Sequence, residues 1–133
     1  FGCAIAGVAD ITIAAESATF SIPEMAHRIL PTMVMSALMD RVPRKELTYL
    51  VYSTAVISAA RARECGLVSE LVPDAKLDEF VEALCKTILN APNPATEGAK
   101  EFLRRAFTMD VPSAIDYARN IHATVNSSSE MRK

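Results

Sequence analysis

The sequence lacks a long apolar segment, and no stretch reaches the roughly 20 residues that are needed to cross a bilayer. Asp10 and Glu16 interrupt its most apolar region. An excess of positive charge is also missing. The net charge is −2, and Lys and Arg are spread along the chain except for a local cluster of Arg104 and Arg105 near Lys100. We therefore expect neither a membrane nor a nucleic acid as a partner.

Cysteine is also scarce. Cys3, Cys65 and Cys85 are odd in number, widely spaced and set among apolar residues, which is typical of reduced thiols rather than of a disulfide framework. This pattern predicts a cytoplasmic protein without a metal site. The chain begins at Phe1 and Gly2 directly in apolar sequence and without an initiator Met, which indicates a fragment. An organellar signal could therefore be missing together with the amino-terminal part.

Several motifs that would identify an enzyme class are absent. The sequence has no phosphate-binding loop, dinucleotide fingerprint, metal-ligand spacing or nucleophile elbow, and these classes are set aside. What is present is a chain of 133 residues, half of them hydrophobic. This is enough for one globular domain with a sizeable core.

Glu24 is the one acid to which we assign chemistry. Its neighbours in sequence are largely apolar, namely Phe20, Ile22, Met25, Ile29 and Leu30. An apolar environment disfavours the charged form of a carboxylate and makes it a better base. The alternative is that Pro23 begins a helix in which Glu24 complements the helix dipole, and the local residues alone favour this alternative. His27, three residues after Glu24, could form an acid/base pair with it, but an ordinary exposed histidine is the simpler interpretation.

The hydrophobic pattern predicts a mainly helical chain with a few short strands. Ser58 is expected to cap the helix at 59–65, Gly66 to end it in a Schellman motif, and Asp74 to cap a long helix. Beyond 73 several apolar stripes need partners, so we expect burial against missing chain, other subunits or both. The expected helices lie at 2–9, from Pro31 to Val42, from Pro43 through Val51, at 59–65, from Asp74 through Ile88, at 99–107 and at 114–125, the strands at 11–13, 18–21 and 67–72, and a frayed tail at 126–133.

Two groups of residues resemble a known family in their order and spacing. The first group is Gly2, Cys3, Ala4, Asp10, Ile11, Ala15, Glu16, Ala18, Phe20, Pro23 and Glu24, and the second is Ile57, Ser58, Ala59, Gly66, Leu67, Val68, Val72 and Pro73. Together they resemble the carboxy-terminal half of the enoyl-CoA hydratase/isomerase (crotonase) family.

This resemblance implies an α/β fold, the crotonase/ClpP-like spiral of ββα units, of which the chain is the second half. Residues 1–73 would end the spiral core and carry the active-site Glu. Residues 74–133 would form a helical carboxy-terminal segment for oligomerisation, which implies homotrimers or hexamers. No cofactor would be bound permanently, because the coenzyme A thioester is the substrate.

The resemblance also implies a site. Glu24 matches one of the two catalytic glutamates of the hydratases, whereas the other position holds Ala4. Phe1 and Gly2 fall where a backbone amide of the oxyanion hole binds the thioester oxygen. Lys100 and Phe107 lie in a helix that approaches the coenzyme of a neighbouring subunit in relatives, although a surface lysine and a core aromatic explain them equally well.

A single catalytic glutamate favours double-bond isomerisation over hydration, since one acid can remove a proton and return it, whereas hydration usually needs two acids. We therefore expect an acyl-CoA enzyme, inactive as this fragment alone. In residues 32–35, Thr, Met, Val and Met replace a stretch that is normally rich in Gly, which leaves the acyl substrate open. The alternative is a family member without catalysis, acting as an acyl-CoA-binding or oligomeric scaffold.

Overall fold

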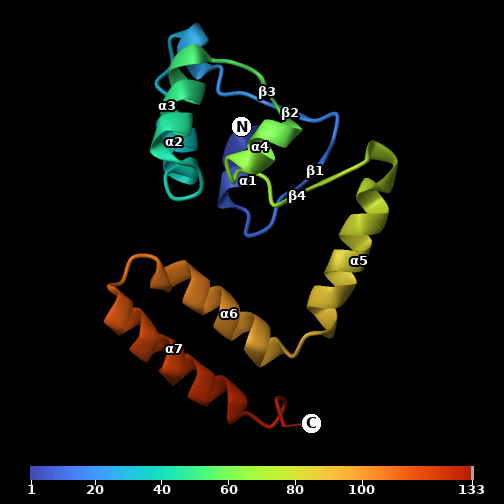
Figure 1. Cartoon of the computed structure of the whole chain (residues 1–133), viewed down its shortest axis with the longest axis vertical. Helices are drawn as coiled ribbons and strands as arrows, with labels where there is room; N and C mark the ends of the chain where they lie inside the picture. Colours follow the sequence, from blue (N-terminus) through green and yellow to red (C-terminus); the bar gives the residue numbers. More distant parts are fainter. Residues whose placement is uncertain (133) are drawn as a thin grey trace. The chain divides into compact units, whose positions relative to one another are not determined.

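The computed structural model describes residues 1–132, which form two compact units, 1–81 and 82–132. Figure 1 shows the order of the elements along the chain. The first unit contains all of the strands in the described residues and several short helices, whereas the second consists of helices. Among residues 1–132, no helix is both long and apolar enough to span a membrane.

The first unit alternates short helices with strands of two or three residues. Its elements are α1 (Gly2–Val8), β1 (Ile13–Ala15), β2 (Thr19–Phe20), the 3₁₀ helix η1 (Glu24–His27), α2 (Thr32–Leu38), α3 (Arg44–Ser53), β3 (Ile57–Ser58), α4 (Ala59–Glu64), β4 (Glu70–Val72) and the 3₁₀ helix η2 (Asp74–Lys76).

Two small sheets connect the beginning of this unit to its end. Strand β1 pairs in parallel with β4, with Ile13 opposite Glu70, and β2 pairs antiparallel with β3, with Thr19 opposite Ser58. Both pairings join residues that are far apart in sequence. The strands therefore fix the path of the chain on either side of η1, which carries Glu24.

One core of apolar side chains holds the first unit together. Ile22, Leu38 and Leu50 are its largest fully buried side chains. At Gly7, an added Cβ would lie 2.5 Å from Leu38 Cδ2 and 2.8 Å from the carbonyl oxygen of Ala37. Only glycine therefore allows α1 to approach α2 this closely. The core consists of Cys3, Ala14, Ile22, Val34, Leu38, Val42, Leu50, Val51, Ile57, Ala59, Ala62, Leu67 and Val68.

The predicted ends of the helix after Ser58 are confirmed. The hydroxyl oxygen of Ser58 accepts a hydrogen bond from the Arg61 amide at 3.3 Å. At the other end, Gly66 has φ +87°, and the Leu67 amide donates to the Ala62 carbonyl at 2.9 Å. This six-to-one bond is the mark of a Schellman motif.

The predicted cap at Asp74 is wrong. Its carboxylate accepts hydrogen bonds from the amide of Ser17, at 3.2 Å, and from the Ser17 hydroxyl. It thereby ties the turn after β1 to the chain after β4, and the long helix begins only at Leu77, after η2. A nonlocal partner has taken the carboxylate that the local pattern assigned to the helix.

Other boundaries also differ from the predictions. The helix after Pro31 ends at Leu38 rather than at Val42, and Pro43 precedes α3 as its N-cap instead of forming its first turn. The first strand lies at 13–15 rather than 11–13. The third predicted strand begins only at Glu70, because the residues before it belong to the turn that ends α4.

The second unit is built mainly from two helices, α6 (Asn93–Ala106) and α7 (Val111–Asn126), which lie side by side in Figure 1. Helix α5 (Leu77–Asn90) begins in the first unit and ends in the second. At Gly98, an added Cβ would lie 2.8 Å from Val125 Cγ2, so glycine allows α6 and α7 to pack closely. The predicted frayed tail is described only as far as residue 132, where it forms turns, and Lys133 lies outside the described residues.

Helix α7 begins at Val111, earlier than predicted, because the Asp110 carboxylate accepts the Ser113 amide at 3.0 Å and caps the helix. The rings of Phe102 and Tyr117 stack across the helix pair with centroids 6.1 Å apart. Within the described chain, however, no residue of α5, α6 or α7 is buried. Large apolar side chains on each of these helices therefore remain exposed to solvent in the single chain.

Candidate active site

Glu24 begins η1, a 3₁₀ helix of four residues, and the chain on both sides of it is held in place. Ile22, just before Pro23, is 1% exposed and anchors the segment in the core. After the helix, the Ile29 amide donates to the Glu24 carbonyl at 3.0 Å. Arg28 lies in the left-handed region with φ 59°, a conformation that non-glycine residues rarely adopt. The backbone of Glu24 is thus fixed by a buried residue before it and by a closed turn after it.

The Glu24 carboxylate is unusual in its partners. The side chain is half-buried, and Oε2 is buried without a hydrogen-bond partner among residues 1–132. A buried polar atom without a partner is costly and uncommon in proteins. A proton, a water molecule or a polar ligand atom would relieve that cost, which makes Oε2 a candidate for proton transfer.

The start of α1 lies beside the segment that leads to Glu24. The Cys3 thiol donates a hydrogen bond to the Ser21 carbonyl at 3.1 Å. Burial raises the pKa of the Cys3 thiol, and the negative charge of Glu24 contributes to the same direction. The charge of Glu24 therefore reaches the first turn of α1, where Gly2 and Ala4 also lie.

Phe1 and Gly2, the residues before Cys3, are exposed to solvent, whereas Ala4, the residue after it, is half-buried. The Phe1 side chain is 93% exposed, and an added Cβ at Gly2 would meet nothing within 4 Å. The Phe1 carbonyl accepts the Ala4 amide at 3.0 Å, which begins the helix, and the first amides of a helix have no carbonyl partner within it. Ala4 is half-buried against the core and has no titratable group.

His27 shares η1 with Glu24. Residues three apart lie on the same side of a 3₁₀ helix, and His27 is exposed. No hydrogen bond joins its ring to Glu24 in the described chain. Within residues 1–132, no hydrogen bond therefore supports these two residues as an acid/base pair.

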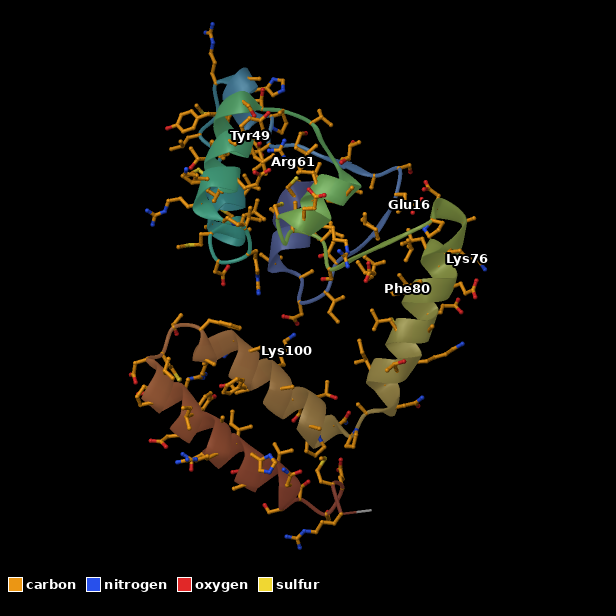
Figure 2. All side chains as sticks on the ribbon, in the orientation of Figure 1. Glu16, Tyr49, Arg61, Lys76, Phe80 and Lys100 are labelled. Carbon is orange, nitrogen blue, oxygen red and sulfur yellow. The ribbon has the colours of Figure 1, made fainter. Side chains whose placement is uncertain are left out.

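Lys100 and Phe107 belong to the second unit. Lys100 is an exposed residue of α6, labelled in Figure 2, and Phe107 follows that helix with 84% of its side chain exposed. The exposure of Phe107 contradicts the interpretation as a core aromatic within this chain. Gly2, Cys3 and Glu24, by contrast, belong to the first unit.

Sequence reasoning missed a second polar cluster in the first unit, which Figure 2 labels at Tyr49 and Arg61. Arg61 Nε donates to Glu46 Oε1 at 2.8 Å, and its guanidinium lies 4.7 Å from the centre of the Tyr49 ring. The hydrogen bond that Arg61 donates to Glu46 raises the pKa of the Arg61 guanidinium. Because Arg61 of α4 contacts both Glu46 and Tyr49 of α3, the cluster is best explained as a link between these two helices.

Comparison with known proteins identifies relatives along the whole chain. A family model described as enoyl-CoA hydratase/isomerase matches residues 1–133. A protein of Mycobacterium bovis named "Probable enoyl-CoA hydratase" is 32% identical over 121 residues, which cover 90% of this chain and 47% of that protein.

Solved structures agree with the sequence match. An enoyl-CoA hydratase of Mycobacterium smegmatis has a TM-score of 0.92 at 25% identity, covering 98% of this chain and 51% of that chain. A structure from Thermobifida fusca, solved in complex with CoA, has a TM-score of 0.86 at 27% identity and covers 92% and 48%. The chain thus spans about half the length of these relatives.

Proposed function

Since the chain belongs to the enoyl-CoA hydratase/isomerase family, we propose that the whole protein moves a proton next to the carbonyl of an acyl-CoA thioester. The predicted α/β crotonase fold is confirmed by the solved structures, of which this chain spans about half. The observation that carries the proposal is the buried Oε2 of Glu24, which has no hydrogen-bond partner among the described residues.

In the proposed reaction, backbone amides that include the Phe1–Gly2 segment bind the thioester oxygen. Negative charge that develops on this oxygen in the transition state is stabilised there, so the proton on the α carbon becomes removable. Glu24 takes that proton as a base and then, as an acid, returns it to the γ carbon. The double bond thereby moves from between the β and γ carbons to between the α and β carbons. The position of Gly2 in the first turn of α1 supports this role, because the first amides of a helix have no carbonyl partner within it.

We propose isomerisation rather than hydration as the main reaction. Hydration usually needs two acids, one that activates water and one that delivers a proton. The position of the second catalytic glutamate is Ala4, which cannot handle a proton. Glu24 would therefore act alone.

The remaining assignments are part of the same proposal. Coenzyme A would be bound as part of the substrate, with Lys100 and Phe107 as contacts from a neighbouring subunit in a homotrimer or hexamer. Residues 74–133 would then serve oligomerisation, and residues 1–73 would end the spiral core. A neighbour solved with CoA and the exposure of both contact residues support this arrangement. The three free cysteines support a cytoplasmic location.

The test is Glu24→Gln in the full-length protein, which keeps the size of the side chain but removes its acid/base chemistry. We expect kcat for isomerisation of 3-enoyl-CoA substrates to fall by about 10²–10⁴-fold, the usual contribution of a general acid/base. Glu16→Gln is the matched control, because Glu16 is an exposed acid in the same unit. Wild-type turnover by Glu24→Gln would exclude the role of Glu24.

The same assays distinguish the two reactions and the alternative function. Hydration of 2-enoyl-CoA by the wild-type protein, at a rate above its isomerisation, would contradict the preference drawn from Ala4. Ala4 also favours the alternative of a catalytically inactive scaffold. Titration with acyl-CoA that shows binding, together with no turnover in either assay, would support the scaffold instead.

A further inference from the structure

The proposed reaction needs two groups that belong to different segments of the chain. One amide donor of the proposed oxyanion hole lies at the start of α1, around Gly2, and the base is Glu24 on η1. This donor must hold the oxygen while Glu24 reaches the neighbouring carbon. Reactions of this kind depend strongly on the relative position of the reacting groups.

Cys3 connects these two segments directly. Its Sγ lies 3.1 Å from the carbonyl oxygen of Ser21, a residue 18 positions further along the chain. Cys3 directly follows Gly2, and Ser21 stands three residues before Glu24. Only a few residues of backbone therefore separate this hydrogen bond from Gly2 on one side and from Glu24 on the other.

The surroundings make this contact effective. Cys3 is 8% exposed and Ile22, next to Ser21, is 1% exposed, whereas Ser21 itself is partly buried, so the hydrogen bond is partly shielded from water. A thiol is a weak donor, and a hydrogen bond that is partly shielded from water is stronger than one in water because the local dielectric is lower. The bond and the packing of Ile22 thus act on the same short segment.

Cys65 shows what a thiol without this role looks like. Its Sγ donates to the Ala62 carbonyl at 3.4 Å, three residues earlier in the same helix, and it is partly buried. Burial raises the pKa of the Cys65 thiol, as it does for Cys3. The two cysteines therefore share their chemistry, and the difference is that Cys3 joins two separate segments.

We propose that Cys3 is a positioning residue for the reaction, because its hydrogen bond to Ser21 sets the distance between the oxyanion amide at Phe1–Gly2 and the base Glu24. The inference rests on the proposed function. It assigns no bond-making step to the thiol. The thiol acts through the backbone of the segment that carries Glu24.

The test compares three variants of the full-length protein in the isomerisation assay. Cys3→Ala removes the donor, and we expect kcat to fall about tenfold with KM little changed, since small misplacements of reacting groups cost up to about 100-fold. Cys3→Ser keeps a donor of similar size and should restore most of the lost kcat. Cys65→Ala is the matched control and should keep wild-type kcat.

Each possible result either supports or overturns the proposed role of Cys3. A low kcat for Cys3→Ala with rescue by Cys3→Ser supports the inference, whereas wild-type kcat for Cys3→Ala, or an equal loss in both variants, overturns it. If Cys3→Ala does not fold, Cys3→Val replaces it, which fills the core without a donor, and wild-type kcat there overturns the inference equally. Glu24→Gln measured in parallel separates the two levels: if it keeps full turnover, the proposed function fails, and if it loses turnover while Cys3→Ala does not, only the role of Cys3 fails.

Discussion

The two units of this chain are stabilised in different ways. Every buried hydrophobic residue in the described chain lies between Cys3 and Val72, within the first unit. The helices of the second unit are amphipathic, yet large apolar side chains such as Leu103 and Ile115 are 58% and 48% exposed. The first unit thus carries its own core, while the second has apolar faces that the single chain does not cover.

The side-chain hydrogen bonds show the same difference. In the first unit, Ser69 accepts the Thr12 amide and Asp74 accepts that of Ser17, both across 57 residues. In the second unit, most such bonds join residues three or four apart, and Tyr117 to Glu101, at 16, is the longest that we find within residues 82–132. The first unit therefore depends on nonlocal contacts, and the second depends on its helices and on whatever covers them.

The largest expected effect comes from truncating one leucine in each unit. Leu38→Ala removes a side chain that is 0% exposed, and we expect a loss of about 2–5 kcal/mol in the free energy of unfolding. Leu103→Ala, at 58% exposure in the single chain, should change it by only about 0.5 kcal/mol where no partner covers α6. Urea denaturation of the full-length protein measures both. A large loss for Leu103→Ala would show that a partner covers α6 in the assembled protein.

A smaller effect is expected from adding a methyl group at each close helix contact. Gly7→Ala places Cβ 2.8 Å from the backbone oxygen of Ala37, which cannot move aside, and we expect a net loss of about 1–2 kcal/mol.

Gly98→Ala is the matched variant in the second unit. Its Cβ meets side-chain atoms of Val125 and Ile121, which can rotate, and alanine favours the helix by about 1 kcal/mol, so the net change should be near zero. The melting temperatures of the two variants test this difference. Equal losses would mean that α6 and α7 are packed as rigidly as α1 and α2.

The smallest expected effect concerns pH. Hydrogen bonds from Ser17 hold the pKa of Asp74 below its ordinary value, and bonds from Ser113 do the same for Asp110. A lowered folded-state pKa stabilises the fold above the ordinary pKa, and this contribution is lost as the pH falls through the folded-state value.

The two carboxylates differ in how far along the chain their hydrogen-bond partners lie, so removing the charge of each should affect a different extent of the structure. Asp74→Asn should weaken the acid dependence of the unfolding of the first unit, because Ser17 lies 57 residues away. Asp110→Asn should affect only the start of α7, because Ser113 lies three residues away. Amide hydrogen exchange between neutral and acidic pH distinguishes the two. An effect of Asp110→Asn that spreads through the first unit would contradict this view.

Sequence patterns predicted the local features well. Ser58 and Gly66 define α4 through contacts within a few residues, and both were predicted correctly. The assignment of Asp74 failed for the opposite reason, since its carboxylate has a partner far along the chain. The helix after Pro31 was predicted too long, because the burial of Val42 in the core resembles a continuing helical stripe.

In the candidate site, too, the features that follow a sequence pattern were predicted, and the contact between distant segments was not. The spacing of Pro23 and Glu24 within the family pattern identified the acid and the family, and the family match confirms the latter. The contact between Cys3 and Ser21 had no signal in the sequence, because nothing in either local pattern indicates the other. The role of Glu24 stays a prediction that the assays above address.

The sequence by itself therefore determined the family, the fold class, the ends of the helix between Ser58 and Gly66, and the acid to which chemistry is assigned. These features depend on residues a few positions apart or on a pattern read in order. Only the tertiary structure decided that Asp74 binds Ser17, that Gly7 lets α1 reach α2 and that Cys3 meets the segment of Glu24. Such contacts arise when distant segments are packed into one core, and no local pattern specifies which distant atoms will meet.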